Sequence, residues 1–512
     1  MSLVRRLATL QSIAKVLQPK PVILPFDSWA PDRARLGSPG GLQALNVIPT
    51  VDGFAPFKAF SVKSDALSAR AIGATAAQNA SGVVSIYSGD RTKLYSLSVQ
   101  VHTDVSKSGG YATAEDGNWE YALFGTTLLA TNFDDPVQGV TVGAGNKFSD
   151  HITSTLKPKA RHIDPVRNHI VLGNTNDATD GSVPERRWWS AINSTVDFQP
   201  NADTLCDFDD ARDIGWCQRI VGGVEYGLAF HERGIERMTF VGSPEIFRFD
   251  RIDRKRGTPI PNSVIAHGRR VFFISEEGFM YNDGTGESVH IGHRYIDREF
   301  WNEFDLTFQA RLSAAIDPLN KLVLWGWVGS GASNNEPSEI YAYSWVENRW
   351  SHIQINHEIL VRSLSQGSSL DELDAISTSL DTLPFSLDSR AYTGGDFVLA
   401  GYDTDHKYGF YDGSNLAATI DTTEVEFSQG RLTRIGNARP LVDGGSPTIS
   451  IRHRNRQQDS VTVASAVSLT TLGQCPQNIS ARYASARMVV PAASTWSHAQ
   501  GVQLEVRSEG RY

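Results

Sequence analysis

The chain has 512 residues, of which 40% are hydrophobic and 21% are charged, and its formal net charge at pH 7 is −9. This length allows two to four domains, or one large β domain with attached parts, and the composition is that of an ordinary globular protein. The acidic balance and the lack of a long basic run argue against a surface built to grip nucleic acid.

The cysteines and the apolar runs exclude further classes of protein. Cys206, Cys217 and Cys475 are odd in number and lack a C-x-x-C spacing, which argues against a disulfide framework or a zinc site and predicts reduced, buried thiols. No run of about 18 apolar residues occurs, so we expect no membrane-spanning segment. We also expect no cofactor and no bound metal.

The first element in chain order is a short amphipathic helix in an N-terminal arm, residues 1–40. Leu3, Leu7 and Leu10 recur at helical spacing, and prolines follow closely. Basic and polar residues interrupt the stretch, so it lacks the apolar core of a signal peptide. The helix either folds back on its own domain or docks on a neighbouring subunit, which makes the three leucines candidate interface residues.

Residues 41–420 are predicted to form a β-propeller of about seven blades, so the fold class is all-β. Glycine and proline separate short runs rich in β-branched and aromatic residues, which is typical of strands joined by turns. The runs group into units spaced by roughly 45 residues, close to the length of a four-stranded blade. The units lie near residues 65–110, 117–150, 159–205, 217–255, 262–300, 310–355 and 358–415.

Two consecutive units show the repeat most clearly. Between Cys217 and Gly292, a strand twice leads into a charged turn that ends in glycine, HERG at 231–234 and SEEG at 275–278, and the next strand follows at once. A unit repeated at this spacing indicates a propeller, a solenoid or an array.

Four tryptophans are candidates for large wedges between neighbouring blades, because such rings bury much apolar area. The alternative is a role in stacking on sugars. The four are Trp188, Trp189, Trp345 and Trp350.

The segment 365–395 breaks the strand rhythm, because it is rich in serine, leucine and aspartate. Leu370, Leu373, Ile376 and Leu380 occur in it at mixed spacing. We interpret the segment as an insertion loop with a short helix, and partner contacts are often made by such loops.

Residues 421–512 are predicted to form a small β-sandwich, because five alternating strands follow one another there. In one of these strands Arg452, Arg454 and Arg456 alternate with other residues, so they are expected to share one face. That face is either solvated or part of an arginine-rich interface.

No catalytic signature is present, and we expect no enzyme activity and no catalytic residue. The chain has no Walker loop, no H-E-x-x-H and no G-x-S-x-G. A propeller glycosidase would need two carboxylates across a cleft, and the sequence places no such pair. The acidic residues available for one are Asp209, Asp210, Glu276, Glu277, Asp283 and Glu299.

Four stretches carry a resemblance to a known family. Residues 26–57 contain a Pro-Asp pair, then Asn-Val-x-Pro and an aromatic-x-Pro element, here Pro31-Asp32, Asn46 to Pro49 and Phe54 to Pro56. Together with 186–200, 229–284 and the C-terminal stretch 481–511, they resemble β-propeller proteins in the tails of short-tailed bacteriophages, namely tail nozzle, tail hub or head-closure proteins.

This resemblance implies a virion protein, assembled in the host cytoplasm, that forms a ring, with six copies expected, around the path of the ejected DNA. The partners it implies are further copies of the chain, a tail tube or adaptor protein, a fibre, needle or plug, and genomic DNA that passes without sequence-specific binding. The insertion near 365–395 is then a candidate gate or fibre contact. The alternatives are a head-completion protein at the head–tail junction, a carbohydrate-binding or carbohydrate-hydrolysing propeller, and a host scaffold propeller.

Deletion of residues 367–388 is expected to leave a folded ring and to change DNA retention or fibre attachment, because the insertion lies outside the predicted strands. Assembly of particles with this deletion, followed by measurement of retained DNA and attached fibres, checks the expectation. Particles unchanged in both properties would contradict it.

Overall fold

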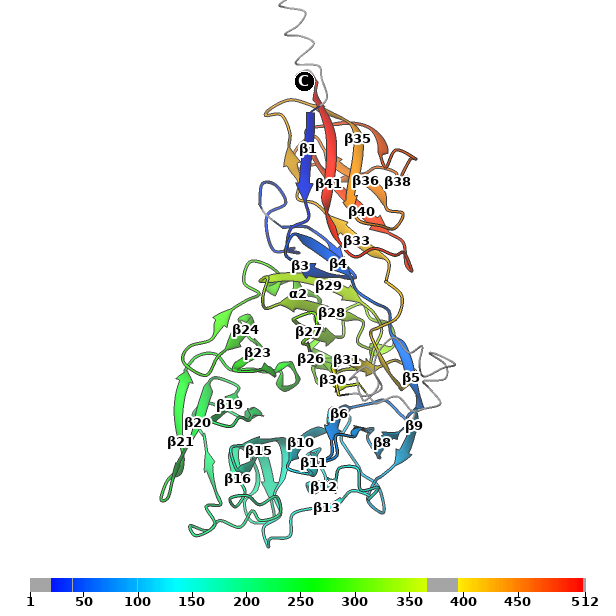
Figure 1. Ribbon diagram of the computed structural model, residues 1–512. Coiled ribbons are helices and arrows are strands. Elements are labelled where there is room, and N and C mark those ends of the chain that lie inside the picture. The colour runs from blue at the N-terminus through cyan, green and yellow to red at the C-terminus, as the bar shows by residue number, and fades with distance from the viewer. Residues whose placement is uncertain (1–19, 39, 99, 366–394, 510–512) are drawn as a thin grey trace, which may run out of the picture.

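Seven four-stranded antiparallel sheets follow one another around a ring (Figure 1) within the described residues 20–38, 40–98, 100–365 and 395–509. The structure is a computed structural model. Six blades are separate sheets, and the sixth in chain order continues into a larger sheet. The predicted all-β propeller is therefore confirmed.

The blades take their strands in chain order, except for the last strand of blade seven. Blade one contains β6 (Gly73–Gln78), β7 (Val84–Gly89), β8 (Leu94–Ser98) and β9 (Val101–Asp104). Blade two contains β10 (Glu120–Phe124), β11 (Thr127–Thr131), β12 (Gln138–Thr141) and β13 (Ser149–Asp150). Blade three contains β14 (Lys159–Val166), β15 (His169–Asp177), β16 (Gly181–Trp189) and β17 (Asp207–Asp210). Blades four and five contain β18 (Cys217–Val221), β19 (Tyr226–His231), β20 (Ile235–Gly242) and β21 (Ile246–Asp253); and β22 (Ile265–His267), β23 (Arg270–Ser275), β24 (Gly278–Asn282) and β25 (Val289–His290). Blades six and seven contain β26 (Ser313–Asp317), β27 (Leu322–Trp327), β28 (Glu339–Ser344) and β29 (Arg349–Gln354); and β30 (Ile359–Leu364), β31 (Phe397–Tyr402), β32 (Lys407–Phe410) and β5 (Ser61–Ala66).

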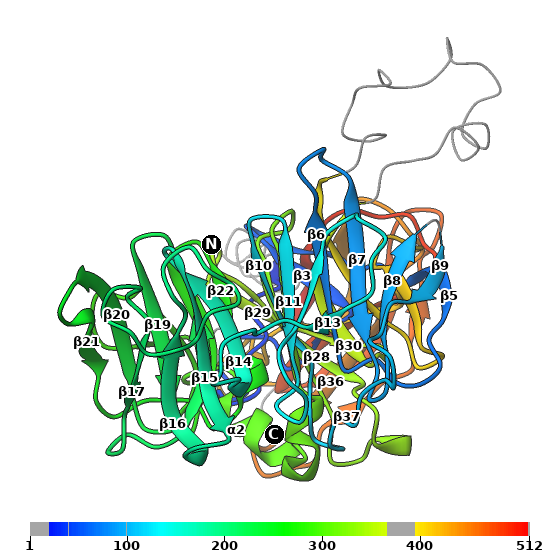
Figure 2. The same cartoon turned by 90° about the horizontal axis from the view of Figure 1, so that it is seen from below.

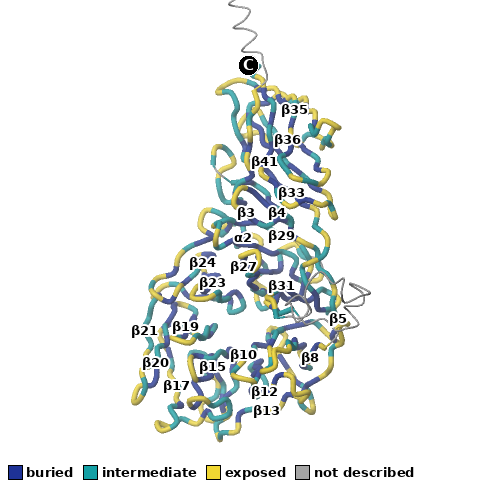
Figure 3. Tube along the Cα trace, viewed as in Figure 1, coloured by how far each residue is buried: buried dark blue, intermediate teal, exposed yellow. Residues whose placement is uncertain are grey.

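Hydrophobic clusters lie between neighbouring blades and hold the ring together. Figure 3 shows the buried stretches of the blade strands along the Cα trace. Strands buried on two faces read as continuous apolar runs, because successive side chains point to opposite faces. Ile170 and Leu172 of β15 pack toward blade two, whereas Val171 between them packs toward blade four. Phe272 and Phe273 of β23 divide in the same way between blades six and four.

The tryptophans predicted to be wedges occupy these interfaces. Trp188 lies in the cluster between blades two and three, and Trp189 lies in the cluster between blades three and four. Trp350 is 0% exposed in the largest cluster, and Trp345 packs against that cluster with its ring 4.5 Å from the ring of His267. The wedge interpretation is confirmed for these residues.

The ring is closed by a strand from the N-terminal side of the propeller. β5 pairs with β32, with Ser61 opposite Phe410 and Val62 opposite Gly409. Blade seven therefore combines residues from the two ends of the propeller sequence, so the ring cannot open without losing this ladder. Figure 2 views the ring from its edge, with short helix α2 (Asp297–Glu303) at one face.

The second domain is a sandwich of two sheets that stands on the outer edge of blade six (Figure 1). One sheet contains β1 (Lys20–Pro25), β3 (Val47–Thr50), β4 (Gly53–Pro56), β35 (Thr433–Val442), β39 (Cys475–Ala481) and β41 (Ala499–Ser508). The other contains β2 (Ala44–Leu45), β33 (Ala418–Asp421), β34 (Val425–Glu426), β36 (Thr448–Arg454), β37 (Thr462–Val463), β38 (Val467–Ser468) and β40 (Tyr483–Val490). The short 3-10 helices are η1 (Pro261–Ser263), η2 (Leu306–Arg311) and η3 (Ser333–Asn335).

The domain boundary differs from the predicted one. Residues 44–56 were expected in the propeller at 41–420, yet β3 and β4 belong to the sandwich, and β33 joins it before residue 421. Phe54 is 0% exposed and pairs with Ala499, 445 positions later. Strands this short have no pattern of their own, and pairing with the C-terminal strands decides where they lie.

One sheet runs from the propeller into the sandwich without a break. The outermost strand of blade six, β29, pairs with β2, and β2 pairs with β33, so that blade six forms part of an 11-stranded sheet. Leu45 lies opposite His352 on one side and Thr419 on the other. The two domains are therefore joined by backbone hydrogen bonds as well as by side chains.

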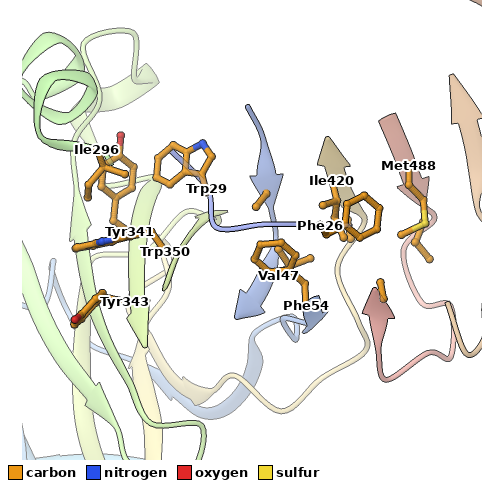
Figure 4. Close-up of a cluster of buried hydrophobic side chains, with 14 of the residues drawn as sticks. Phe26, Trp29, Val47, Phe54, Ile296, Tyr341, Tyr343, Trp350, Ile420 and Met488 are labelled. Atoms are coloured by element: carbon orange, nitrogen blue, oxygen red, sulfur yellow. The ribbon is translucent and has the colours of Figure 1, made fainter. Parts of the chain in front are cut away.

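A single buried cluster accompanies this sheet across the boundary (Figure 4). The indole of Trp350 donates to the Ile291 carbonyl at 3.0 Å, and its backbone N–H donates to Ser28 Oγ at 3.1 Å. Next to it, the Arg349 guanidinium donates to the carbonyls of Phe26 and Thr50 at 3.0 and 2.7 Å. These bonds fasten the N-terminal segment between the domains.

The predictions about the cysteines and membrane spans can be compared with the structure, whereas two predicted segments lie outside the described residues. Cys206, Cys217 and Cys475 are buried and free, as predicted, and burial raises the pKa of Cys206 and Cys217 to about 12. Within the described ranges, no helix is long and apolar enough to cross a membrane. The predicted N-terminal helix with Leu3, Leu7 and Leu10 lies outside the described residues, as do Leu370, Leu373, Ile376 and Leu380 of the predicted insertion.

Trp350→Ala is expected to lower the free energy of unfolding by about 3–5 kcal/mol, because it leaves a cavity in the cluster shared by the two domains. Calorimetry should show one transition shifted as a whole. Val346→Ala, at a 54% exposed site in the preceding turn, is the matched control and should change stability by less than about 0.5 kcal/mol. A Trp350→Ala chain as stable as wild type would contradict the joined core.

Candidate functional site

The first strands of blades two, three and four enclose a polar cavity of ≈ 300 Å³. These strands, β10, β14 and β18, contact one another from blade to blade and form the inner wall of the ring. The segments that lead into blades five and six complete the lining, with Pro261 and Ala310 among their residues. The cavity therefore exists only when several blades are in place.

Glu120 is the centre of an ion network in this wall. Its carboxylate accepts from His162 Nδ1 at 2.9 Å, from the Ile163 N–H at 3.2 Å and from Arg219 at 3.0 Å. Burial would raise the pKa of Glu120, but Arg219 and His162 outweigh it and lower the pKa below its usual value. The ionised carboxylate thus ties blades two, three and four together.

Asp164 lies on the same strand as His162, and its pKa is shifted in the opposite direction to that of Glu120. Its carboxyl accepts from the Gly222 N–H at 2.6 Å. Burial raises the pKa of Asp164 to about 7, and the negative charge of Glu120 adds to this effect. Gly222 has no room for a side chain, since a Cβ there would lie 2.0 Å from the Pro165 carbonyl oxygen.

This wall combines groups that proton-transfer chemistry uses, since a carboxyl with a pKa near 7 stands close to a Glu–His pair. Each of these groups is also bonded to the protein itself and links two blades. The geometry therefore supports a structural role for the Glu120 and Asp164 bonds, and it leaves other polar groups in the cavity for contact with a ligand.

The arginines predicted to form an interface divide between two environments. Arg452 forms an ion pair with Asp421, and Arg454 binds Glu424 with Nε 2.8 Å from Oε1. Arg456 lies beyond the end of β36 and is exposed. The three do not share one free face, because β36 ends at Arg454 and the first two side chains are held within the sandwich.

The carboxylates considered for a glycosidase pair are spread over separate elements. Asp209 and Asp210 on β17 bind arginines of β16, the second at 2.7 Å from Arg186 Nε. Glu277 follows β23 and lies 2.9 Å from Arg256 Nε. Within the described part of the chain, no group of three or more potential ligands could hold a metal ion.

A second cavity, of ≈ 380 Å³, lies where α2 meets blade six and the N-terminal segment. Glu299, Glu303 and Glu339 line it together with the rings of Trp29 and Tyr341. Burial raises the pKa of Glu299, and the charges of Glu303 and Asp32 add to this. Of these residues, only Glu299 was singled out from the sequence, because the lining comes from three distant segments and follows no motif.

Comparisons with known proteins add little beyond the architecture. No protein-family model matches the chain, and no curated protein matches it. Among solved structures, YCF48 bound to a D1 peptide is 10% identical with a TM-score of 0.34, covering 58% of this chain and 86% of that one.

Two other solved structures are similarly remote. The Swd1 (Cps50) β-propeller of Myceliophteria thermophila is 8% identical with a TM-score of 0.37, covering 59% of this chain and 92% of that one. A chain of the mitotic checkpoint complex is 9% identical with a TM-score of 0.36, covering 71% and 96%. The propeller assignment rests on the strand pairing described above.

Asp164→Asn is expected to gain stability relative to wild type as the pH rises from about 4 to about 7. The pKa of Asp164 is about 7 in the folded chain, whereas the ordinary value of 3.8 applies to the unfolded chain. Between these values the folded state binds more protons, so wild-type stability falls with pH on account of this group, whereas asparagine is neutral throughout.

Urea unfolding of the two proteins at pH 4.5, 6 and 8 measures this difference. Asparagine keeps an oxygen for the Gly222 N–H, so the bond itself is preserved. A difference in unfolding free energy that stays constant with pH would contradict the raised pKa.

Proposed function

We propose that this chain is a structural subunit of a short-tailed phage tail, a nozzle or hub component that forms part of the conduit for ejected DNA. The proposal joins the resemblance in the sequence to the way the two domains are built together. It assigns the chain a geometric role, in which copies of one rigid body surround a passage and dock neighbouring tail proteins.

The supporting observation is that residues of the first stretch of the resemblance, 26–57, lie at the junction between propeller and sandwich. Asp32 accepts from the N–H groups of Arg298 and Glu299, at 2.7 and 3.0 Å, at the start of α2. Asn46 accepts from the Gln354 N–H at 2.9 Å and donates to the Ala417 carbonyl at 2.9 Å. Residues that hold two domains together have a structural role, and such a role fits a family of proteins that act by forming a ring.

A rigid, elongated subunit suits assembly into a ring. Each contact in a cyclic ring joins two different surfaces, and the ring closes only if the angle between subunits is constant. The continuous sheet fixes the angle between propeller and sandwich within each copy. The net charge of −9 also suits a passage for DNA, because an acidic wall does not bind phosphates.

Mass spectrometry of purified phage particles is the test of this proposal. A nozzle or hub subunit should be present at a fixed stoichiometry, about six copies by analogy with the family. Absence of the chain from washed, DNA-filled particles would refute a virion role.

The position in the particle separates the alternatives within this proposal. Labelling of the chain, followed by electron microscopy, should mark the distal end of the tail for a nozzle. A label at the head–tail junction would instead assign a head-completion role. Purified chain should also form closed rings at high concentration, and a strict monomer in the presence of its tail neighbours would count against the ring.

A further inference from the structure

Three buried polar side chains line the cavity in the inner wall, and one of them has a buried ring nitrogen without a partner in the described part of the chain. Asn174 and Gln218 are 3% and 9% exposed, and both line the cavity. His162, 5% exposed, also lines it, and its Nε2 has no hydrogen-bond partner. Buried polar groups are nearly always satisfied, so His162 Nε2 indicates an occupant that the protein itself does not supply, and the two amides line the same cavity.

The hydrogen-bonding roles of these groups limit the kind of occupant. Glu120 is ionised and only accepts, so His162 Nδ1 carries the proton that it donates to Glu120. Burial lowers the pKa of His162, so the ring is neutral and Nε2 accepts. The two amides each donate and accept. The occupant therefore needs several groups that both donate and accept, as hydroxyls do.

The charges of the lining nearly balance. The lining contains three acidic residues, Asp116, Glu120 and Glu232, and two arginines, Arg161 and Arg219. Glu120 and Arg219 already form an ion pair with each other at 3.0 Å. A strongly charged ligand, such as a phosphate ester, would face charges of its own sign. An uncharged ligand fits this lining better.

Trp216 adds an apolar platform at the cavity. Its side chain is 53% exposed, and its backbone N–H is held by Glu232 at 3.3 Å, so the indole lies at the rim. An exposed indole beside hydroxyl-matching amides suits a ligand that has one apolar face and a polar edge. The cavity volume of ≈ 300 Å³ is at the lower end for small-molecule sites, which suits a ligand of one or two rings.

We propose that this cavity is a binding site for a neutral carbohydrate, with a sugar ring on Trp216 and its hydroxyls bonded to Asn174, Gln218 and His162. This is binding without chemistry, and it involves no catalytic residue. The inference is independent of the proposed tail function, because the site is formed by the propeller of a single chain.

The first experiment is a glycan array probed with the purified full chain, with each hit measured again by calorimetry. Neutral mono- or oligosaccharides should bind, and sialylated or sulfated versions and inorganic phosphate should bind more weakly. No binding up to about 10 mM of any array sugar, beyond the millimolar range of weak sites, would overturn the proposal and leave a water-filled cavity. Preferential binding of the charged probes would overturn it as well.

Substitutions in the lining test whether the sugar binds in this cavity. Trp216→Ala should weaken the affinity for the hit sugar by about tenfold, and Trp216→Phe should retain most of it, because a ring remains as platform. Gln218→Ala should also weaken it by about tenfold through loss of hydrogen bonds. Val224→Ala, 87% exposed on the same blade, is the matched control and should leave the affinity unchanged.

A deoxy form of the hit sugar provides a readout that does not depend on folding of a variant. Loss of a hydroxyl that meets a buried amide should reduce affinity by about 100-fold or more, since the amide is then unpaired. If Trp216→Ala binds like wild type, the sugar lies elsewhere and the assignment of this cavity is wrong.

Discussion

The pairing of β29 with β2, and of β2 with β33, is the contact on which the arrangement of the molecule depends. It makes blade six and half of the sandwich one sheet of 11 strands, so a hinge between the domains would have to break a ladder. The cluster around Trp350 and Phe54 adds side-chain packing along the same line (Figure 4). Because apolar burial is the main favourable term in folding, breaking this line would expose a large part of the core.

The ring itself depends on apolar clusters between blades and on its closing strand. Each interior strand contributes to two clusters, as Val171 does on one side and Leu172 on the other. The ladder between β5 and β32 then joins the first and last parts of the propeller sequence. With the ring closed, polar groups on the inner strands are fixed in place, and the cavity lined by Asn174 and Gln218 follows from that rigidity.

The parts of the fold that the sequence predicted are those with a local signal. The turns HERG and SEEG do lie between paired strands, β19 with β20 and β23 with β24, because glycine and charged residues mark turns whatever surrounds them. Trp188 and Trp189 were predictable as wedges, since adjacent large rings on a strand must face two interfaces. Residues 44–56 were assigned to the wrong domain, because their partners lie hundreds of positions later.

The candidate site could not be predicted from the sequence. Glu120, His162 and Arg219 come from three blades and carry no spacing that distinguishes them from ordinary surface residues. Their charges meet only because the first strands of successive blades lie side by side. The ion pairs of Arg452 and Arg454 could not be predicted for a similar reason, because the acids that bind them lie in a separate segment, and the interface role of these arginines stays a prediction. The resemblance to phage tail proteins stays a prediction.

Single-particle electron cryomicroscopy of the purified full chain tests the central claim, that propeller and sandwich are one rigid body, most directly. The account predicts that the two domains keep one relative orientation in all particles, whether single or in rings, with continuous density from blade six into the sandwich. Particles in which the sandwich takes a range of angles to the propeller, or in which density breaks between β29 and β2, would contradict it.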